Sequence, residues 1–170
     1  MIILIKIILL ISLLLILYQD IKQRQIWVIL LPIFAVTGSL LFYYSTMTSF
    51  FLYSILINLA LVGVLILINY LFAKFILKMS LFKEALGIGD VLFFIAFAMS
   101  FPTISFINFF VFSLLFSLVL QMMLKLFSKE KKQITEDNFN TIPLAGYMSG
   151  FLIAIYSYHW LGFYQSIYLL

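Results

Sequence analysis

The sequence predicts an all-α membrane protein with about six transmembrane helices. Of its 170 residues, 66% are hydrophobic and 9% are charged, and the mean hydropathy is +1.24. Soluble domains carry about 25% charged residues, so this composition is typical of an integral membrane protein. A crossing helix needs about 20 apolar residues, which leaves room for roughly six crossings and little else. We therefore expect residues 1–170 to form a single transmembrane domain.

Six apolar runs match this count. They are residues 2–18, 26–44, 50–73, 91–101, 104–124 and 142–160. The fourth run is short, because at about 1.5 Å per residue it reaches only about half of a hydrocarbon core of about 30 Å. Pro102 follows it directly, and a proline inside one long helix would kink that helix. We therefore expect two separate helices here.

The basic residues predict the orientation. Nine of the ten lie in alternate connections between the runs, and the intervening connections carry no charge. The nine are Lys22, Arg24, Lys74, Lys78, Lys83, Lys125, Lys129, Lys131 and Lys132. The positive-inside rule places these connections in the cytoplasm and both termini outside. This topology also explains the net charge of +4 without a nucleic-acid partner.

Several kinds of chemistry are excluded by residue type. The chain has no cysteine, so disulfides, thiolate zinc sites and cysteine nucleophiles are impossible. His159 is the single histidine and cannot build a metal site alone. We expect it to be an interfacial side chain near the end of the last helix, and we expect neither a metal nor a cofactor.

Two acidic residues lie at the ends of apolar runs on the same predicted side of the membrane. Asp20 follows the first run and Asp90 precedes the fourth, so both return to the cytoplasmic face. They meet if the first and fourth helices pack together. Two carboxyl groups at close range cannot both ionise at low cost, so such a pair shares a proton. One member can then activate water while the other protonates a carbonyl oxygen or a leaving amine.

Glycines flank the second acid. Gly87 and Gly89 have no side chain, so the backbone beside Asp90 can bend sharply and a substrate strand can approach it. A simpler alternative is that these glycines only separate two helices, with Asp90 as a first-turn acid stabilised by the helix dipole. Glu84 lies six residues before Asp90. It either orients basic residues of a substrate or is an ordinary solvated acid.

Polar and aromatic residues in the runs have simpler explanations. We expect Asn58, Asn69, Asn108 and Gln121 to form hydrogen bonds between helices, each worth about 1 kcal/mol. The aromatic residues Trp27, Tyr43, Tyr44, Tyr147 and Trp160 lie where interfacial anchors are expected.

Three strings of residues resemble one family. EALGIGDV, residues 84–91, resembles the second active-site motif of the type IV prepilin peptidases, which are membrane aspartyl proteases of the GxGD type. DIKQRQI, residues 20–26, is similar to that family's first motif, in which an aspartate ends the first peptidase helix. IPLAGYMSGF, residues 142–151, resembles the Ile-Pro-Phe-Gly-Pro stretch at the head of the family's final helix. The three occur in the family's order and span most of the chain.

This resemblance implies an activity and a substrate. Asp20 and Asp90 would be the catalytic pair of an aspartic endopeptidase, supported by Gly87, Gly89 and Glu84. The substrates would be prepilins or pilin-like (pseudopilin) precursors, whose leader is cut after a glycine at the cytoplasmic surface of the plasma membrane. No cofactor is implied. Many members also carry an N-terminal domain with paired C-x-x-C motifs and N-methyltransferase activity, so for this cysteine-free chain we expect cleavage without methylation.

Some positions depart from the family pattern. Trp27 and Val28 stand where proline and asparagine are usual, Leu92 stands where a lysine is common, and residues 144–146 are Leu-Ala-Gly instead of Phe-Gly-Pro. These departures keep a catalytically inactive homologue as one alternative. Another is a small ion- or proton-coupled transporter that uses the two acids. Transporters place such acids near the middle of the membrane, whereas Asp20 and Asp90 lie at helix ends.

Overall fold

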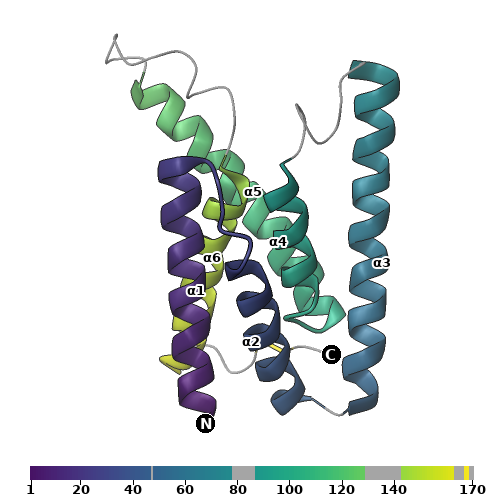
Figure 1. Cartoon of the computed structure of the whole chain (residues 1–170), viewed down its shortest axis with the longest axis vertical. Coiled ribbons are helices and arrows are strands. Elements are labelled where there is room, and N and C mark those ends of the chain that lie inside the picture. Colours follow the sequence, from purple (N-terminus) through teal and green to yellow (C-terminus); the bar gives the residue numbers. More distant parts are fainter. Residues whose placement is uncertain (47, 78–86, 129–142, 163–166, 169–170) are drawn as a thin grey trace.

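The computed structural model describes the whole chain except residues 47, 78–86, 129–142, 163–166 and 169–170. The described residues form helices and contain no β-strand. The α-helices are α1 (Ile2–Gln23), α2 (Leu30–Ser45), α3 (Thr48–Phe72), α4 (Ile88–Ala98), α5 (Thr103–Ser128) and α6 (Leu144–Trp160), shown in Figure 1. A π-helical turn, η1 (Ala73–Leu77), continues α3.

The order of these helices matches the six apolar runs. Within the described residues, three segments are long and apolar enough to cross a membrane by themselves, namely Ile2–Gln23, Phe50–Phe75 and Thr103–Leu126. α2 and α4 are apolar but shorter, and α6 has 17 residues. The structure therefore supports an all-helical membrane protein, and six crossings remain a prediction.

Two boundaries near the first connection differ from those expected. α1 continues past residue 18 to Gln23, so Asp20 lies within its last turn. α2 begins at Leu30 and not near residue 26. Pro32 explains this start, because its ring would clash with the carbonyl group of residue 28 inside a helix. The segment between the helices is tied to α1 by a hydrogen bond of 3.0 Å from the Trp27 N–H to Gln19 Oε1.

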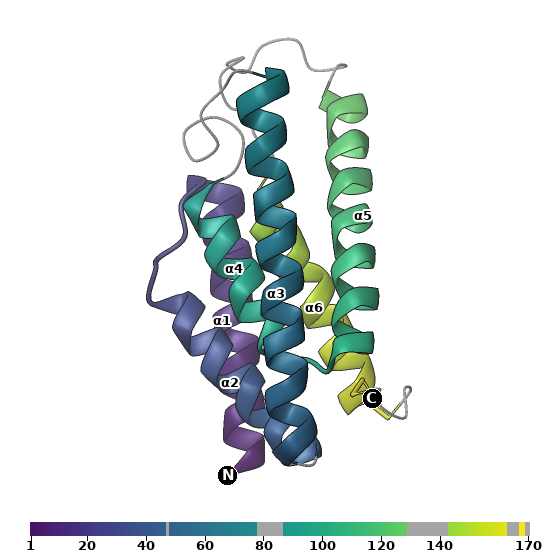
Figure 2. The same ribbon diagram turned by 90° about the vertical axis from the view of Figure 1, so that its right-hand side faces the viewer.

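Successive helices run in alternating directions. The last turns of α1, α3 and α5 and the first turns of α4 and α6 lie at one end of the bundle, at the top of Figures 1 and 2. The N-terminus and the turn between α2 and α3 lie at the other end. α1 packs mainly against α6 and α2, and α4 packs mainly against α2 and α3. The segments that carry the two acids therefore reach the same end.

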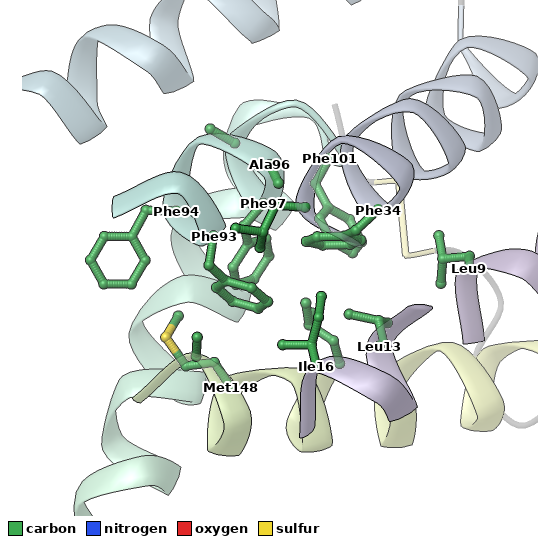
Figure 3. Close-up of a cluster of buried hydrophobic side chains, with 14 of the residues drawn as sticks. Leu9, Leu13, Ile16, Phe34, Phe93, Phe94, Ala96, Phe97, Phe101 and Met148 are labelled. Atoms are coloured by element: carbon green, nitrogen blue, oxygen red, sulfur yellow. The ribbon is translucent and has the colours of Figure 1, made fainter. Parts of the chain in front are cut away.

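An apolar core holds α4 between its neighbours. The labelled side chains in Figure 3 come from α1, α2, α4, α6 and the residue before Pro102: Leu9, Leu13, Ile16, Phe34, Phe93, Phe94, Ala96, Phe97, Phe101 and Met148. The rings of Phe34 and Phe93 stack with centroids 5.5 Å apart, and Phe97 meets Phe106 edge to face at 5.7 Å. Phe93 lies one turn after Asp90, so this packing fixes the start of α4.

Interhelical hydrogen bonds join the long helices to the core. Asn58 of α3 is fully buried, and its Nδ2 donates to the carbonyl oxygens of Ala98 at 2.9 Å and Phe101 at 2.8 Å. The predicted interhelical role of Asn58 is confirmed. The same prediction was wrong for Asn69, which is exposed and donates to Leu65 of its own helix.

Candidate active site

The two acids singled out in the sequence meet at the N-terminus of α6. Asp20, in the last turn of α1, is 7% exposed, and Asp90, in the first turn of α4, is half-buried. Asp20 Oδ2 accepts a hydrogen bond of 2.6 Å from the N–H of Gly146, and Asp90 Oδ1 accepts one of 3.1 Å from the N–H of Ala145. Because Ala145 and Gly146 are adjacent in the chain, the two carboxyl groups lie side by side.

α6 brings the acids together. From the sequence, the acids would meet if the first and fourth helices packed together; in the structure, α1 packs extensively on α6, and α4 also contacts α6. The first N–H groups of a helix have no acceptor within that helix, and its N-terminus carries a partial positive charge. Pro143, the N-cap residue of α6, provides no side-chain hydrogen bond. Asp20 and Asp90, which lie on other helices, act as the capping side chains instead. They accept hydrogen bonds from the N–H groups of the second and third residues of α6, which an N-cap side chain normally reaches.

The electrostatics of the pair combine opposing effects. Burial and mutual repulsion disfavour two negative charges side by side, so the pair favours a single charge and a shared proton. The amides of α6 favour the carboxylate form, and the positive charge of Arg24 acts in the same direction on Asp20. The arrangement therefore suits one ionised and one protonated carboxyl group, which can work as a base and an acid.

Gly87 leaves space beside Asp90. It is the N-cap of α4, and its carbonyl oxygen accepts the N–H groups of Asp90 at 3.1 Å and Val91 at 3.2 Å. Its φ of −67° and ψ of 144° are open to any residue, so the expected need for glycine's backbone freedom is not seen. A Cβ at this position would lie 3.2 Å from Asp90 Oδ2. The absence of a side chain is therefore what matters at Gly87.

Gly89 takes no part in the hydrogen bonds that Asp20 and Asp90 accept from α6, and Glu84 cannot be placed. Gly89 lies in the first turn of α4, where a Cβ would be 3.5 Å from Ile26 Cδ1. This distance is an ordinary van der Waals contact, so the packing does not require glycine at position 89. Glu84, like Lys83, lies outside the described residues, so its expected supporting role is untested.

Leu92, which replaces an expected lysine, lines an apolar hollow between α2 and α4. The hollow has a volume of about 200 Å³ and is lined by Val28, Leu31, Pro32, Ala35, Leu92, Ile95 and Ala96. A lysine at position 92 would extend among these apolar side chains. Within the described residues, a positive charge that acts on Asp20 comes from Arg24, directly after α1.

Sequence reasoning missed three residues near the pair. Tyr147 was expected to be an interfacial anchor, and this was wrong: it is 7% exposed and its hydroxyl group donates to Gln121 Oε1 at 3.3 Å. Arg24 was assigned only to topology. Gly146 was noted as a departure from a motif, although its place in the first turn of a helix could have marked it as an amide donor.

Potential metal ligands do not cluster in the described part of the chain. It contains no group of three or more His, Cys, Asp or Glu side chains that could hold a metal ion. Comparison of the chain with protein-family models, curated proteins and solved structures found no match. A functional proposal therefore has to depend on the residues and their geometry.

Proposed function

We propose that this chain is a membrane aspartyl endopeptidase that removes the leader peptide of prepilins or pilin-like (pseudopilin) precursors. One observation carries the proposal: Asp20 and Asp90 converge on the adjacent amides of Ala145 and Gly146. These residues belong to the three strings that resemble the type IV prepilin peptidase motifs. A prepilin peptidase needs two neighbouring carboxyl groups, and this pair provides them.

The proposed topology has six crossings, with both termini outside and the acid pair at the cytoplasmic side of the plasma membrane. The alternating directions of the helices support it, since the pair lies at the end of the bundle where α1, η1 and α5 carry Lys22, Lys74 and Lys125 in their last turns. The leader of a pilin-like precursor lies on that side. The positions of Asp20 and Asp90 within the last and first turns of their helices also favour a peptidase over a transporter, whose acids lie deeper.

The proposed reaction is general acid–base hydrolysis with water as the nucleophile. One carboxylate takes a proton from water while the water oxygen bonds to the carbonyl carbon of the peptide. The partner carboxylic acid supplies the proton needed by the carbonyl oxygen, and the C–N bond then breaks to release the leader. No covalent bond between enzyme and substrate is formed.

Leader removal in cells tests the proposal. The chain is co-expressed with each of several pilin-like precursors, and the mass of the precursor is measured by immunoblot and mass spectrometry. We expect wild type to shorten at least one precursor after a glycine and Asp20→Asn and Asp90→Asn to leave it intact. Glu136→Gln removes an acid elsewhere in the chain and should cleave normally. Processing that survives both aspartate substitutions, or wild type that processes no precursor, would overturn the proposal.

A further inference from the structure

The two hydrogen bonds that α6 donates to the acid pair differ in length. The bond from Gly146 to Asp20 is 2.6 Å long, and the bond from Ala145 to Asp90 is 3.1 Å. Hydrogen bonds from N–H groups to charged carboxylates shorten to about 2.7–2.9 Å and are stronger than neutral ones. Burial disfavours the charge on both acids; among the described residues, the N–H of Gly87 also favours a carboxylate at Asp90, whereas the positive charge of Arg24 favours a carboxylate at Asp20. The environment therefore stabilises a carboxylate at Asp20 more than at Asp90.

The short bond depends on glycine at position 146. A Cβ placed there would lie 3.0 Å from both Cβ and Oδ2 of Asp20, which is tighter than ordinary contacts. A larger residue would require the Asp20 side chain, which accepts this hydrogen bond, to shift by a few tenths of an ångström. The motif that residues 142–151 resemble has proline at this place, and proline has no N–H to donate. The bond to Asp20 is therefore a feature of this chain's own sequence.

We infer that Gly146 is a positioning residue that keeps Asp20 ionised, which makes Asp20 the base and Asp90 the acid of the pair. This inference rests on the proposed peptidase function. The charged and titratable groups that face Asp20 within the described residues are Arg24 directly after α1, Asp90 on α4 and Tyr147 on α6. Arg24 supports the negative charge of Asp20, and burial together with that negative charge favours the protonated form of Asp90.

This assignment gives each proton a place. Water transfers a proton to Asp20 as its oxygen bonds to the carbonyl carbon, and Asp90 donates its proton to the carbonyl oxygen. When the C–N bond breaks, Asp20 returns its proton to the leaving amine. One hydroxyl group of the tetrahedral intermediate gives a proton back to Asp90 as the new carboxyl group forms. The pair thus ends in the state in which it began.

Carbodiimide labelling tests the inference without any substrate. A hydrophobic carbodiimide reacts with protonated carboxyl groups, and mass spectrometry of the purified full chain in nanodiscs measures the adducts at Asp20 and Asp90 across a range of pH. In wild type we expect Asp90 to be labelled at least several-fold faster than Asp20 near neutral pH. Gly146→Ala and Gly146→Pro should raise the labelling of Asp20 several-fold and extend it to higher pH.

Gly150→Ala is the matched control. Gly150 lies one turn further along α6 and also faces α1, but a Cβ there would meet Leu17 Cδ1 at an ordinary 3.5 Å. This variant should label as wild type does. Unchanged labelling of Asp20 in Gly146→Ala, or faster labelling of Asp20 than of Asp90 in wild type, would overturn the inference. If Gly146→Pro does not fold, Gly146→Ala alone decides the result.

Kinetics provide a second readout once a cleaved precursor is known. Gly146→Ala should lower kcat at least tenfold with KM within about twofold of wild type, and shift the pH profile of kcat, because the base is displaced but substrate contacts remain. An unchanged pH profile would contradict the positioning role. If wild type cleaves no precursor but the labelling pattern is as expected, the peptidase proposal fails while the effect of Gly146 on Asp20 stands.

Discussion

Asp20 and Asp90 are seventy positions apart in the sequence, yet their carboxyl groups accept hydrogen bonds from adjacent amides in the first turn of α6. The same contacts cap α6 and place two acids side by side. Each acid thus has a structural and a proposed chemical role. Asparagine keeps a side-chain oxygen that can accept the amide bond, so Asn variants separate these roles better than Ala variants do.

Asn58 should contribute to stability through its two interhelical hydrogen bonds. Asn58→Leu leaves the buried carbonyl oxygens of Ala98 and Phe101 without this donor. We expect a loss of about 1–2 kcal/mol in the free energy of unfolding, measured by titration with a denaturing detergent. Asn69→Leu is the control, because the Asn69 amide is exposed and bonds only within α3. Equal effects of the two substitutions would contradict the assigned role of Asn58.

Gly38 should be intolerant of a side chain. A Cβ at Gly38 would overlap the side chain of Ser100 and lie 2.7 Å from its Cβ, where α2 crosses the end of α4. Overpacking of this kind costs about 1–3 kcal/mol, so Gly38→Ala should lower the thermal midpoint of unfolding. Gly63 has no atom within 4 Å of its Cβ position. Gly63→Ala should therefore be neutral or stabilising, and a larger loss there than at Gly38 would be inconsistent with this packing.

The proposed topology predicts which positions face each side of the membrane. The chain has no native cysteine, so single cysteines can be labelled without background. Ser45→Cys, at the exposed end of α2, should react with a membrane-impermeant maleimide in intact cells. Gln25→Cys, in the exposed segment after α1, should react only after the membrane is permeabilised. The reverse pattern would place the acid pair on the outer side.

Local sequence patterns were sufficient to predict where most of the helices lie in the chain. The apolar runs predicted the order of the α-helices in the part of the chain that the structure describes, and Pro102 correctly predicted separate fourth and fifth helices. The start of α2 was placed too early because residues 26–29 are apolar, and hydropathy does not register the steric effect of Pro32 on the preceding turn. The expected approach of Asp20 to Asp90 is seen, since both acids sit at helix ends that return to one side.

Contacts between residues far apart in the sequence could not be predicted from local sequence patterns. The role of Gly146 depends on an amide that only the packing of α6 against α1 brings to Asp20. Tyr147 was misplaced because an aromatic ring with a hydroxyl group suits a membrane interface and a hydrogen-bonded core equally well. Its partner, Gln121, lies on another helix, so neither residue alone indicates the pairing.

The rate of leader removal by purified protein tests most directly whether the acid pair is one catalytic unit. Wild type, Asp20→Asn, Asp90→Asn and the double variant are compared in nanodiscs with one purified pilin-like precursor. Groups that act together lose their effect together, so each single variant should fall by about 10²–10⁴-fold and the double variant no further. A single variant that stays within about tenfold of wild type, or losses that multiply in the double variant, would contradict the account.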